Sequence, residues 1–363
     1  MNGESIVFSA GTSDGSVFSL QLTPNNDYKH PLLFKSLFVD PDAHESTIKS
    51  ISPYRDFIIT GSSDDIIQIY CTSLKRNLGC IESETAPITD IKWIKISSDS
   101  LFHFVVSSED GSISIWKFII DEETKEIGTE CIRRMKRHTG CVRSIDIHPS
   151  NKACISIGED RTVRVWDLMH GRQSYVLNIK SAVECPQSVS FSPSGNFFMV
   201  TWHNKFQLIR LISPDATKHG EVVDEVEFNK PFTANPVIFK ETNDAIYLVT
   251  SSGKACDLYK CTLNNQKPVH FGSINITGKR IKTMDCLDCP GWDESRILVL
   301  TSTDADASYV RAFKVDLELL TEVENSFQEV SKLIGTFDLD NARISVASVL
   351  WHSEEFRFLM KNK

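Results

Sequence analysis

Short alternating or apolar segments recur along the whole chain, and each has the length of a β-strand. Clear examples are FIITGSS, IIQIYC, HFVVSS, SISIWKF, FFMVTW, AIYLVTS and RILVLTS. Glycine, asparagine, aspartate and serine bound these segments, as they commonly do at strand ends. The 3.6-residue periodicity of a helix is missing over any long window. The pattern therefore predicts an all-β protein.

A large apolar or aromatic residue recurs at one equivalent position of the pattern, which indicates an internal repeat. Aligning the segments on Trp166 gives seven such positions: Leu20, Tyr70, Trp116, Trp166, Ile209, Tyr259 and Phe313. Consecutive positions are 43 to 54 residues apart, which is typical of the four-stranded blades of a β-propeller. Although 363 residues would suit two or three domains, the repeat favours one seven-bladed propeller spanning residues 1–363.

One stretch, residues 137–168, contains a matched set of polar side chains for a buried network. The set consists of His138 in a loop, Ser156 on a second strand, Asp160 in a tight turn and Trp166 on a third strand. The histidine can bond to the aspartate, and the hydroxyl can bridge the imidazole to the indole N–H. Each buried polar group then has a partner. This layout matches one blade of a WD-repeat propeller, and it indicates architecture rather than catalysis.

Two further copies of the set support the repeat. The second copy consists of His44, Thr60, Asp64 and Tyr70. It keeps the offsets of the first, with the hydroxyl four residues before the aspartate and the aromatic residue six after it. We expect the tyrosine O–H to make the bond that the indole N–H makes in the first copy. The third copy has Asp110 and Trp116, but Val106 replaces the hydroxyl, so its network should be incomplete.

The two ends of the sequence predict how the ring closes. The chain begins with a second-strand segment, SIVFSAG, and finishes with RISVASVLW, which resembles a first strand. Joining this last strand to three N-terminal ones would remove the open sheet edges that promote aggregation. Long insertions at 23–31, 119–130 and 316–330 follow third strands, and the acidic segments 121–130 and 316–330 are interpreted as solvated loops.

Composition excludes several classes of protein. No apolar run approaches the length of a membrane span, and the N-terminus lacks a signal-peptide pattern. The 10 cysteines are best explained as reduced strand residues, as at Cys71, Cys154 and Cys261, so a cytosolic or nuclear compartment is expected. Cys286 and Cys289 form a Cys-x-x-Cys pair, but no second pair with suitable spacing completes a zinc site. We expect no metal, no cofactor and no catalytic residues.

One region is basic, although the whole chain has a net charge of −9. From Cys131 to Arg172 the chain has nine Lys or Arg residues against four acids. The candidates for contact with RNA or another partner are Arg133, Arg134, Lys136, Arg137, Arg143 and Arg161. Two interpretations remain open: a solvated outer strand whose charge suppresses strand pairing, or a site for an RNA backbone or an acidic partner. Trp202 is expected in the core, whereas Trp292 follows Pro290-Gly291 and could be an exposed contact.

The chain resembles the WD-repeat family of PAK-interacting proteins, whose fungal counterparts assist assembly of the large ribosomal subunit. The resemblance rests on TGSSDDIIQIY (60–70), SSEDGSISIW (107–116), the run 138–180, FSPSGN (191–196) followed by HNKFQLIRL, and NARISVASVLW (341–351). The extension HGRQSYVLNIK and the closing segment are more particular than the general WD-repeat features. The resemblance is good over 44–211 and at the end, and thin over 212–330. Family members usually continue into a lysine-rich tail, whereas this sequence stops at Lys363.

The resemblance implies a non-catalytic scaffold for maturation of the large ribosomal subunit and its rRNA. Its location would be the nucleus and nucleolus, its partners pre-ribosomal proteins and rRNA, and its state a monomer within a larger assembly without membrane contact. The alternative is a signalling adaptor that binds and negatively regulates a PAK-type protein kinase. A ubiquitin-ligase substrate receptor fits less well, because Met169 stands where an arginine is expected after Trp-Asp. An enzyme fits least.

Overall fold

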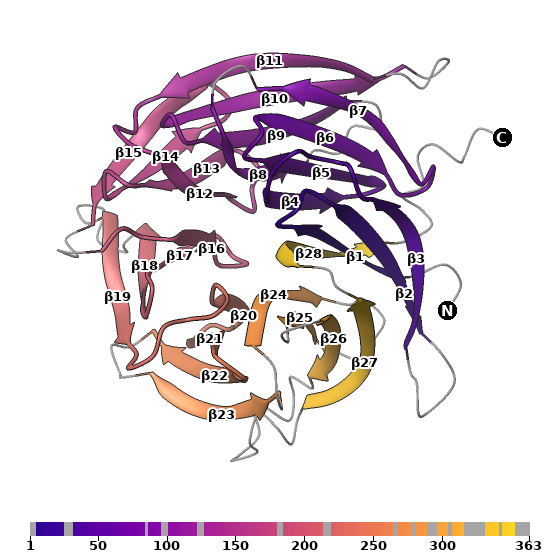
Figure 1. Cartoon of the computed structure of the whole chain (residues 1–363). Helices are drawn as coiled ribbons and strands as arrows, with labels where there is room; N and C mark the ends of the chain where they lie inside the picture. Colours follow the sequence, from indigo (N-terminus) through magenta and orange to yellow (C-terminus); the bar gives the residue numbers. More distant parts are fainter. Residues whose placement is uncertain are drawn as a thin grey trace.

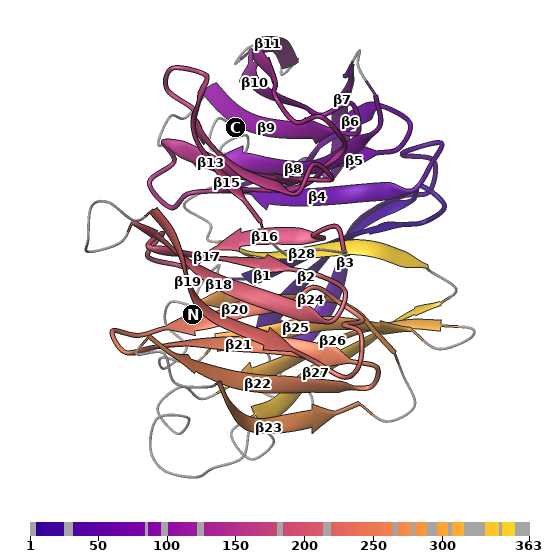
Figure 2. The same cartoon turned by 90° about the vertical axis from the view of Figure 1, so that its left-hand side faces the viewer.

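Seven four-stranded antiparallel sheets surround a central axis in the computed structural model, so the chain is an all-β, seven-bladed propeller (Figure 1). The structure describes residues 5–24, 32–83, 86–95, 101–121, 127–179, 184–212, 219–263, 268–276, 280–288, 296–303, 307–315, 331–340 and 343–352. Within these ranges no helix could span a membrane. Seen edge-on, the blades follow one another around the ring (Figure 2).

Blade 1 combines the last strand with the first three, and each later blade is built from four consecutive strands; the strands are named in the order from the axis outward (Figure 1). Blade 1 contains β28 (Ile344–His352), β1 (Ser5–Thr12), β2 (Val17–Pro24) and β3 (Leu32–Asp40). Blade 2 contains β4 (Ile48–Tyr54), β5 (Phe57–Ser62), β6 (Ile66–Cys71) and β7 (Arg76–Glu82). Blade 3 contains β8 (Ile88–Ile94), β9 (Leu101–Ser108), β10 (Ser112–Ile120) and β11 (Ile127–Lys136). Blade 4 contains β12 (Val142–Ile147), β13 (Ala153–Gly158), β14 (Thr162–Asp167) and β15 (Arg172–Asn178).

The remaining three blades complete the ring in the same order. Blade 5 contains β16 (Ser188–Phe191), β17 (Phe197–Thr201), β18 (Lys205–Ile212) and β19 (His219–Glu227). Blade 6 contains β20 (Val237–Glu241), β21 (Ala245–Ser252), β22 (Ala255–Thr262) and β23 (Val269–Asn275). Blade 7 contains β24 (Arg280–Asp288), β25 (Arg296–Thr303), β26 (Ala307–Val315) and β27 (Ser331–Asp340).

The seven aligned sequence positions occupy one equivalent site in the seven blades. Each lies on the third strand, and in every blade the pairing with the outermost strand shifts register at that residue. Six of the seven side chains are buried, and that of Tyr259 is half-buried. A shared irregularity at one alignment position shows that the repeat predicted from sequence has the correct phase.

The apolar core is divided among the junctions between blades. Each of the seven clusters of buried apolar side chains in the described residues joins two neighbouring blades. In the cluster between blades 2 and 3, Phe57, Phe102 and Phe118 pack with ring centroids 4.8 to 5.4 Å apart. Trp202 is 1% exposed and belongs to the cluster between blades 4 and 5, as expected. Trp292 lies outside the described residues.

The ring closes as the sequence predicts, because the C-terminal strand pairs with the N-terminal one. β28 is antiparallel to β1, with Ser348 opposite Ser9. The Ser345 hydroxyl also donates to the Ile48 carbonyl oxygen of blade 2, at 2.7 Å. Blade 1 is therefore completed by both ends of the described chain, which lie together in Figure 1. Of the insertions predicted at 23–31, 119–130 and 316–330, residues 25–31, 122–126 and 316–330 lie outside the described residues. The interpretation of 121–130 as a loop was wrong in part, because residues 127–130 pair with β10 as the start of β11.

Candidate functional site

The polar set in blade 4 forms one continuous network. His138 Nδ1 lies 2.9 and 3.0 Å from the two carboxylate oxygens of Asp160. His138 Nε2 lies 2.8 Å from Ser156 Oγ, and the Trp166 indole N–H donates to the same oxygen at 2.8 Å. One pattern of hydrogens satisfies every bond: the imidazole donates from Nδ1 to Asp160 and accepts from Ser156 at Nε2.

The electrostatics agree with a structural role for this network. Burial lowers the pKa of His138 below its usual 6.5, although Asp160 opposes the shift. Burial raises the pKa of the Asp160 carboxylate, but hydrogen bonds from His138 and Thr162 lower it by more, so the pKa of Asp160 is also below its usual value. The histidine is therefore neutral and the aspartate ionised at neutral pH. A buried imidazole with both nitrogens occupied has no position left from which to act on a substrate.

Blade 2 repeats part of this network and corrects one expectation. His44 Nδ1 lies 3.1 Å from Asp64 Oδ2, and Nε2 lies 2.8 Å from Thr60 Oγ1. The Tyr70 hydroxyl does not contact Thr60. It donates instead to Asp40 Oδ2, at 2.9 Å. The hydroxyl of a tyrosine lies farther from the backbone than the indole N–H of a tryptophan. It therefore extends past Thr60 and reaches the end of β3 in the neighbouring blade.

In blade 3, the tryptophan finds a partner on its own strand. Without a hydroxyl at Val106, the Trp116 indole N–H donates to Ser114 Oγ, at 2.8 Å. Asp110 accepts from the Ser112 backbone N–H at 2.9 Å and from Lys136 Nζ at 3.1 Å. The aspartate thus stabilises its turn without belonging to a buried chain of hydrogen bonds. The following glycine, Gly111, has φ +84° and packs against the backbone of His138 and Gly140.

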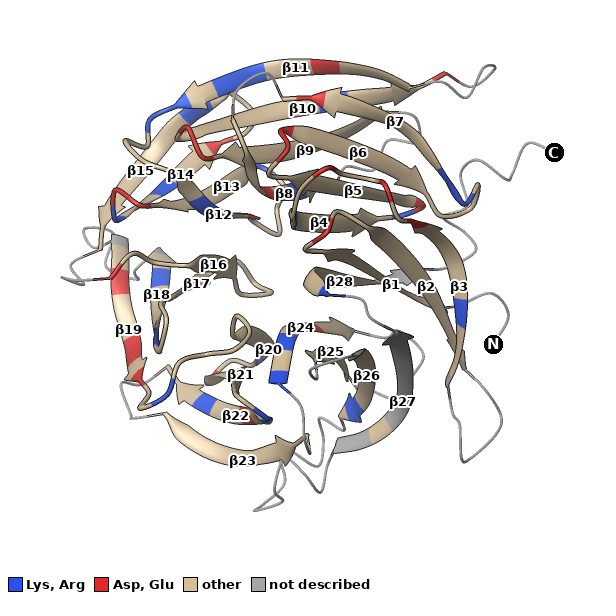
Figure 3. Ribbon diagram, viewed as in Figure 1, with Lys and Arg blue, Asp and Glu red and all other residues tan. Residues whose placement is uncertain are grey.

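The six basic candidates do not form one patch, because the structure divides them among three places. Arg133, Arg134 and Lys136 lie on β11, the outermost strand of blade 3, and Arg137 follows directly. Arg143 lies near the start of β12, beside the central cavity. Arg161 is exposed in the turn between β13 and β14, with φ +59°. Figure 3 shows the blue segment of β11 at the outer rim of the propeller, away from β12.

The first four of these residues line a groove between blades 3 and 4, which we name the lateral groove. Its volume is about 720 Å³, and its basic lining residues are Arg133, Arg134, Lys136, Arg137, Arg164 and Arg172. Gly171 packs against the Arg133 side chain so closely that a Cβ there would lie 2.0 Å from Arg133 Cδ. Arg164 and Arg172 belong to the basic region of the sequence, but contacts between blades place them here, and sequence spacing did not single them out.

The cations of the lateral groove are only partly neutralised. Lys136 pairs with Asp110 at 3.1 Å, Arg164 with Asp160 at 3.4 Å and Arg172 with Asp167 at 3.7 Å. Arg134 donates to a backbone carbonyl oxygen, that of Ser83, at 2.9 Å. Within the described part of the chain, Arg133 and Arg137 have neither a hydrogen-bond partner nor an ion-pair partner. The groove therefore presents six cations against three acids, an excess suited to a phosphate backbone or an acidic protein.

The cysteine pair receives no further support as a metal site. Cys286 is half-buried on β24, and its thiol lies 3.4 Å from the Ile238 carbonyl oxygen of blade 6. Cys289 lies outside the described residues. Cys71, Cys154 and Cys261 are buried on strands, as predicted. Burial raises the pKa of all three thiols, so these cysteines are poor nucleophiles at neutral pH.

Comparison with known proteins agrees with the fold and with the family resemblance. The family model described as WD domain, G-beta repeat matches residues 35–71, 75–117 and 129–167. A p21-activated protein kinase-interacting protein 1-like from Gallus gallus is 27% identical over 81% of this chain and 71% of its own length. Protein MAK11 from Saccharomyces cerevisiae is 31% identical over 38% of this chain and 34% of its own length. A ribosome biogenesis protein WDR12 homolog from Nematostella vectensis is 30% identical over 34% of this chain and 28% of its own length.

Proposed function

We propose that this seven-bladed WD-repeat propeller is a non-catalytic scaffold in ribosome biogenesis, acting in maturation of the large ribosomal subunit and its rRNA. Its relatives include a WD-repeat protein named for ribosome biogenesis, and its fold is a rigid ring that presents several surfaces at once. A preformed surface loses little conformational entropy on binding. Its partners would be pre-ribosomal proteins and rRNA, and its location the nucleus and nucleolus.

The observation that carries the RNA contact is the lateral groove. Six cations converge between β11 and the outer strands of blade 4, although the whole chain has a net charge of −9. Free guanidinium groups at Arg133 and Arg137 suit bidentate contact with phosphate oxygens. Charge on an outer strand also suppresses strand pairing, but that explanation does not require Arg164 and Arg172 to converge on the same groove.

The test is a charge-reversal variant of the groove, Arg133→Glu, Arg134→Glu, Lys136→Glu and Arg137→Glu. A matched control, Lys35→Glu, Arg76→Glu, Lys230→Glu and Lys254→Glu, makes the same change in net charge at exposed sites on other blades. On a sucrose gradient of native cell extract, the groove variant should leave the pre-ribosomal fraction and the control should remain in it. Retention of a folded groove variant would refute RNA contact through this groove.

Salt dependence gives a second measure of the same interaction. Binding to purified single-stranded rRNA should weaken as salt rises, because each protein–phosphate interaction releases counterions. Removing one such interaction should reduce the slope of log affinity against log salt by about 0.7–0.9. If the groove variant and the control have equal slopes, the cations do not touch RNA.

The second candidate function is a signalling adaptor that negatively regulates a PAK-type kinase. It rests on the names of relatives that cover most of this chain, such as the Gallus gallus protein. Affinity purification from the native cell separates the two functions: pre-ribosomal proteins support the scaffold, and a kinase without them supports the adaptor. Neither function requires a catalytic residue.

A further inference from the structure

An exposed threonine directly follows the basic end of the lateral groove. Lys136 and Arg137, the last groove residues of blade 3, stand three and two positions before Thr139 in the sequence. Arg133 and Arg134 stand six and five positions before it. Protein kinases select substrates partly by charge pattern, and many require basic residues at the second and third positions before the acceptor hydroxyl. Thr139 is the only serine or threonine of the whole sequence with basic residues at both positions.

The segment that contains Thr139 has the side-chain alternation of an extended chain. Lys136 is the last residue of β11, the outermost strand of blade 3. Beyond it, Arg137 and Thr139 are exposed, whereas His138 between them is buried. Side chains two positions apart lie on the same side of an extended chain, so Arg137 and Thr139 face the solvent together. A kinase can therefore contact both side chains while the imidazole stays in its network.

Few interactions hold the Thr139 segment, which we define as residues 137–140, apart from the buried histidine. The Thr139 backbone N–H donates to Asp160 Oδ2 at 3.2 Å. In the part of the chain that the structure describes, the Thr139 hydroxyl has no hydrogen-bond partner, and residues 137–140 make no backbone–backbone hydrogen bond. The hydroxyl is therefore available to react, and little opposes a small movement of its backbone into the cleft of a kinase.

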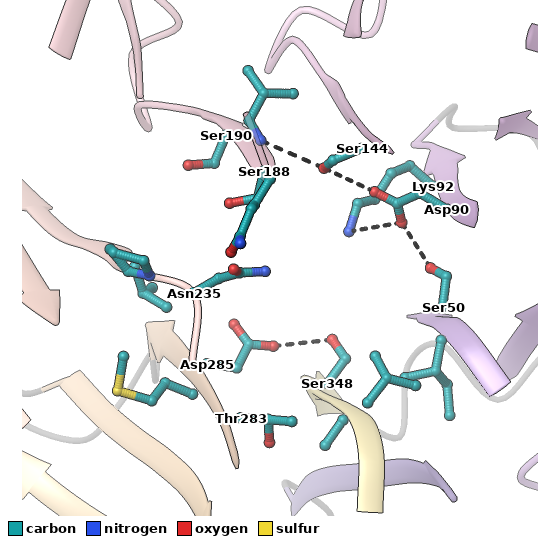
Figure 4. Close-up of a pocket in the computed structure, with 18 of the residues that line it drawn as sticks. Ser50, Asp90, Lys92, Ser144, Ser188, Ser190, Asn235, Thr283, Asp285 and Ser348 are labelled. Atoms are coloured by element: carbon teal, nitrogen blue, oxygen red, sulfur yellow. Dashed lines mark hydrogen bonds and ion pairs between the residues drawn. The ribbon is translucent and has the colours of Figure 1, made fainter. Parts of the chain in front are cut away.

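Serine hydroxyls around the central cavity are in the opposite situation, as Figure 4 shows. Ser50 Oγ donates to Asp90 at 2.7 Å, and Ser144 Oγ donates to the same carboxylate at 3.1 Å. Ser348 Oγ donates to Asp285 at 2.9 Å. These hydroxyls are occupied in joining neighbouring blades, and the carboxylates beside them would repel a phosphate group. The combination of a free hydroxyl and adjacent cations is therefore absent from these three serines.

The charges around the free hydroxyl favour a phosphate group. The two acids that contact the Thr139 segment are already paired, Glu159 with Arg143 and Asp160 with Arg164 at 3.4 Å. Arg137 has no ion-pair partner among the described residues, and it lies on the same exposed side as the hydroxyl. A phosphothreonine carries a charge of about −1.5 to −2 and three acceptor oxygens, which suit a guanidinium group.

We propose that Thr139 is a phosphorylation site for a protein kinase that selects basic residues, and that the phosphate weakens contact between the lateral groove and RNA. In the reaction, Thr139 Oγ1 attacks the γ-phosphorus of ATP and its proton passes to a base of the kinase. The bond from the γ-phosphorus to the bridging oxygen breaks, and ADP leaves. The groove has six cations against three acids, and the phosphate reduces this excess of three positive charges to about one. The effect on RNA rests on the proposed function, whereas the acceptor site does not.

The acceptor site is tested by incubating the full chain with ATP and the catalytic subunit of a cAMP-dependent protein kinase, followed by mass spectrometry. We expect phosphate on Thr139. We expect none on Thr129, which is an exposed threonine of the same strand without basic residues at the two selected positions. Lys136→Ala with Arg137→Ala should slow the reaction at least about tenfold, and Thr139→Ala should abolish it.

A synthetic peptide of residues 131–143 separates the sequence motif from the folded site. Phosphorylation of Thr139 in both the peptide and the folded chain supports the proposal. A peptide that reacts while the folded chain does not would show that the segment is inaccessible, and a peptide that does not react would show that the motif is not recognised. Equal incorporation into the wild type and Thr139→Ala would place the acceptor elsewhere. Each of these three results would overturn the proposal.

The effect on the groove is measured by comparing the phosphorylated and unmodified full chains in binding to a fluorescein-labelled rRNA fragment at low salt. The phosphorylated chain should bind about tenfold more weakly, because about two positive charges of the groove are neutralised. Thr139→Ala treated with the kinase should bind like the unmodified wild type. Equal affinities of the two forms would overturn the regulatory effect. If the unmodified chain does not bind RNA, the proposed function fails and the regulatory effect fails with it, while mass spectrometry still decides the acceptor site.

Discussion

Replacing Asp160 with alanine tests whether the blade 4 network stabilises the fold as a connected unit. The carboxylate accepts from His138 Nδ1 at 2.9 Å, from Thr162 Oγ1 at 2.8 Å and from the Thr139 backbone N–H at 3.2 Å. The His138 side chain is 0% exposed, so water cannot replace its missing acceptor. An unsatisfied buried donor costs about 1–3 kcal/mol. The other bonds lie nearer to solvent and add about 1 kcal/mol, so we expect a loss of about 2–4 kcal/mol.

The matched control is Asp110→Ala in blade 3, at the equivalent turn. Asp110 accepts from the Ser112 backbone N–H and pairs with Lys136, whose side chain is 61% exposed. When the carboxylate is removed, water can hydrogen-bond to both of its former partners, so we expect a loss of about 0.5–1.5 kcal/mol. The two variants remove the same chemical group from the same kind of turn. Their difference therefore measures the contribution of the buried histidine.

Equilibrium urea denaturation provides the assay, with tryptophan fluorescence as the signal because Trp166 belongs to the network. Both variants should keep the wild-type dependence on urea and differ in midpoint, since the surface exposed on unfolding is unchanged. Equal losses of stability in the two variants would refute the argument that the connected network matters. A loss of stability in Asp110→Ala alone would contradict the same argument.

Three further outcomes follow from the same interactions. Because the folded pKa values of His138 and His44 lie below 6.5, the unfolded state binds protons first, so stability should fall as pH is lowered through 6.5; urea midpoints that do not change there would contradict this. Ser156→Ala leaves His138 Nε2 and the Trp166 N–H without their partner and should cost about 2–4 kcal/mol, against less than about 1 kcal/mol for an exposed serine such as Ser150. Deleting residues 341–363 removes β28 and should give aggregates in size-exclusion chromatography; a monomer with an unchanged thermal midpoint would show that closure is dispensable.

Much of the fold is predictable because its repeat is encoded in local sequence. The third-strand position recurs at Leu20 and Phe313 although neither retains the tryptophan, since an apolar side chain is required there to fill the space between blades. The strand at residues 344–352 is predictable for a related reason. A first strand without a blade of its own must complete another.

The candidate site is less predictable, because its contacts connect residues that are far apart in the sequence. The Tyr70 hydroxyl bonds to Asp40, 30 residues earlier, and neither residue shows this pairing in its local pattern. Arg143 and Arg133 belong to one basic segment, which groups them in the sequence. The chain crosses from the outermost strand β11 to the innermost strand β12, however, and this separates them. The charge of the segment is visible in the sequence, whereas the order of strands within each sheet determines where that charge lies.

The closure of blade 1 has a consequence for how the protein must fold. The inner partner of β1 lies at the other end of the chain: Ser345 bonds to Gly11 across 334 residues. Six blades can form from strands that are neighbours in sequence, but this one pays the entropy of closing the longest loop in the molecule. Until β28 pairs, the edge of β1 and the apolar faces of blades 1, 2 and 7 are open to other chains. The pairing of β28 with β1 thus protects these surfaces, and the rate of this pairing should determine how strongly the refolding yield depends on protein concentration.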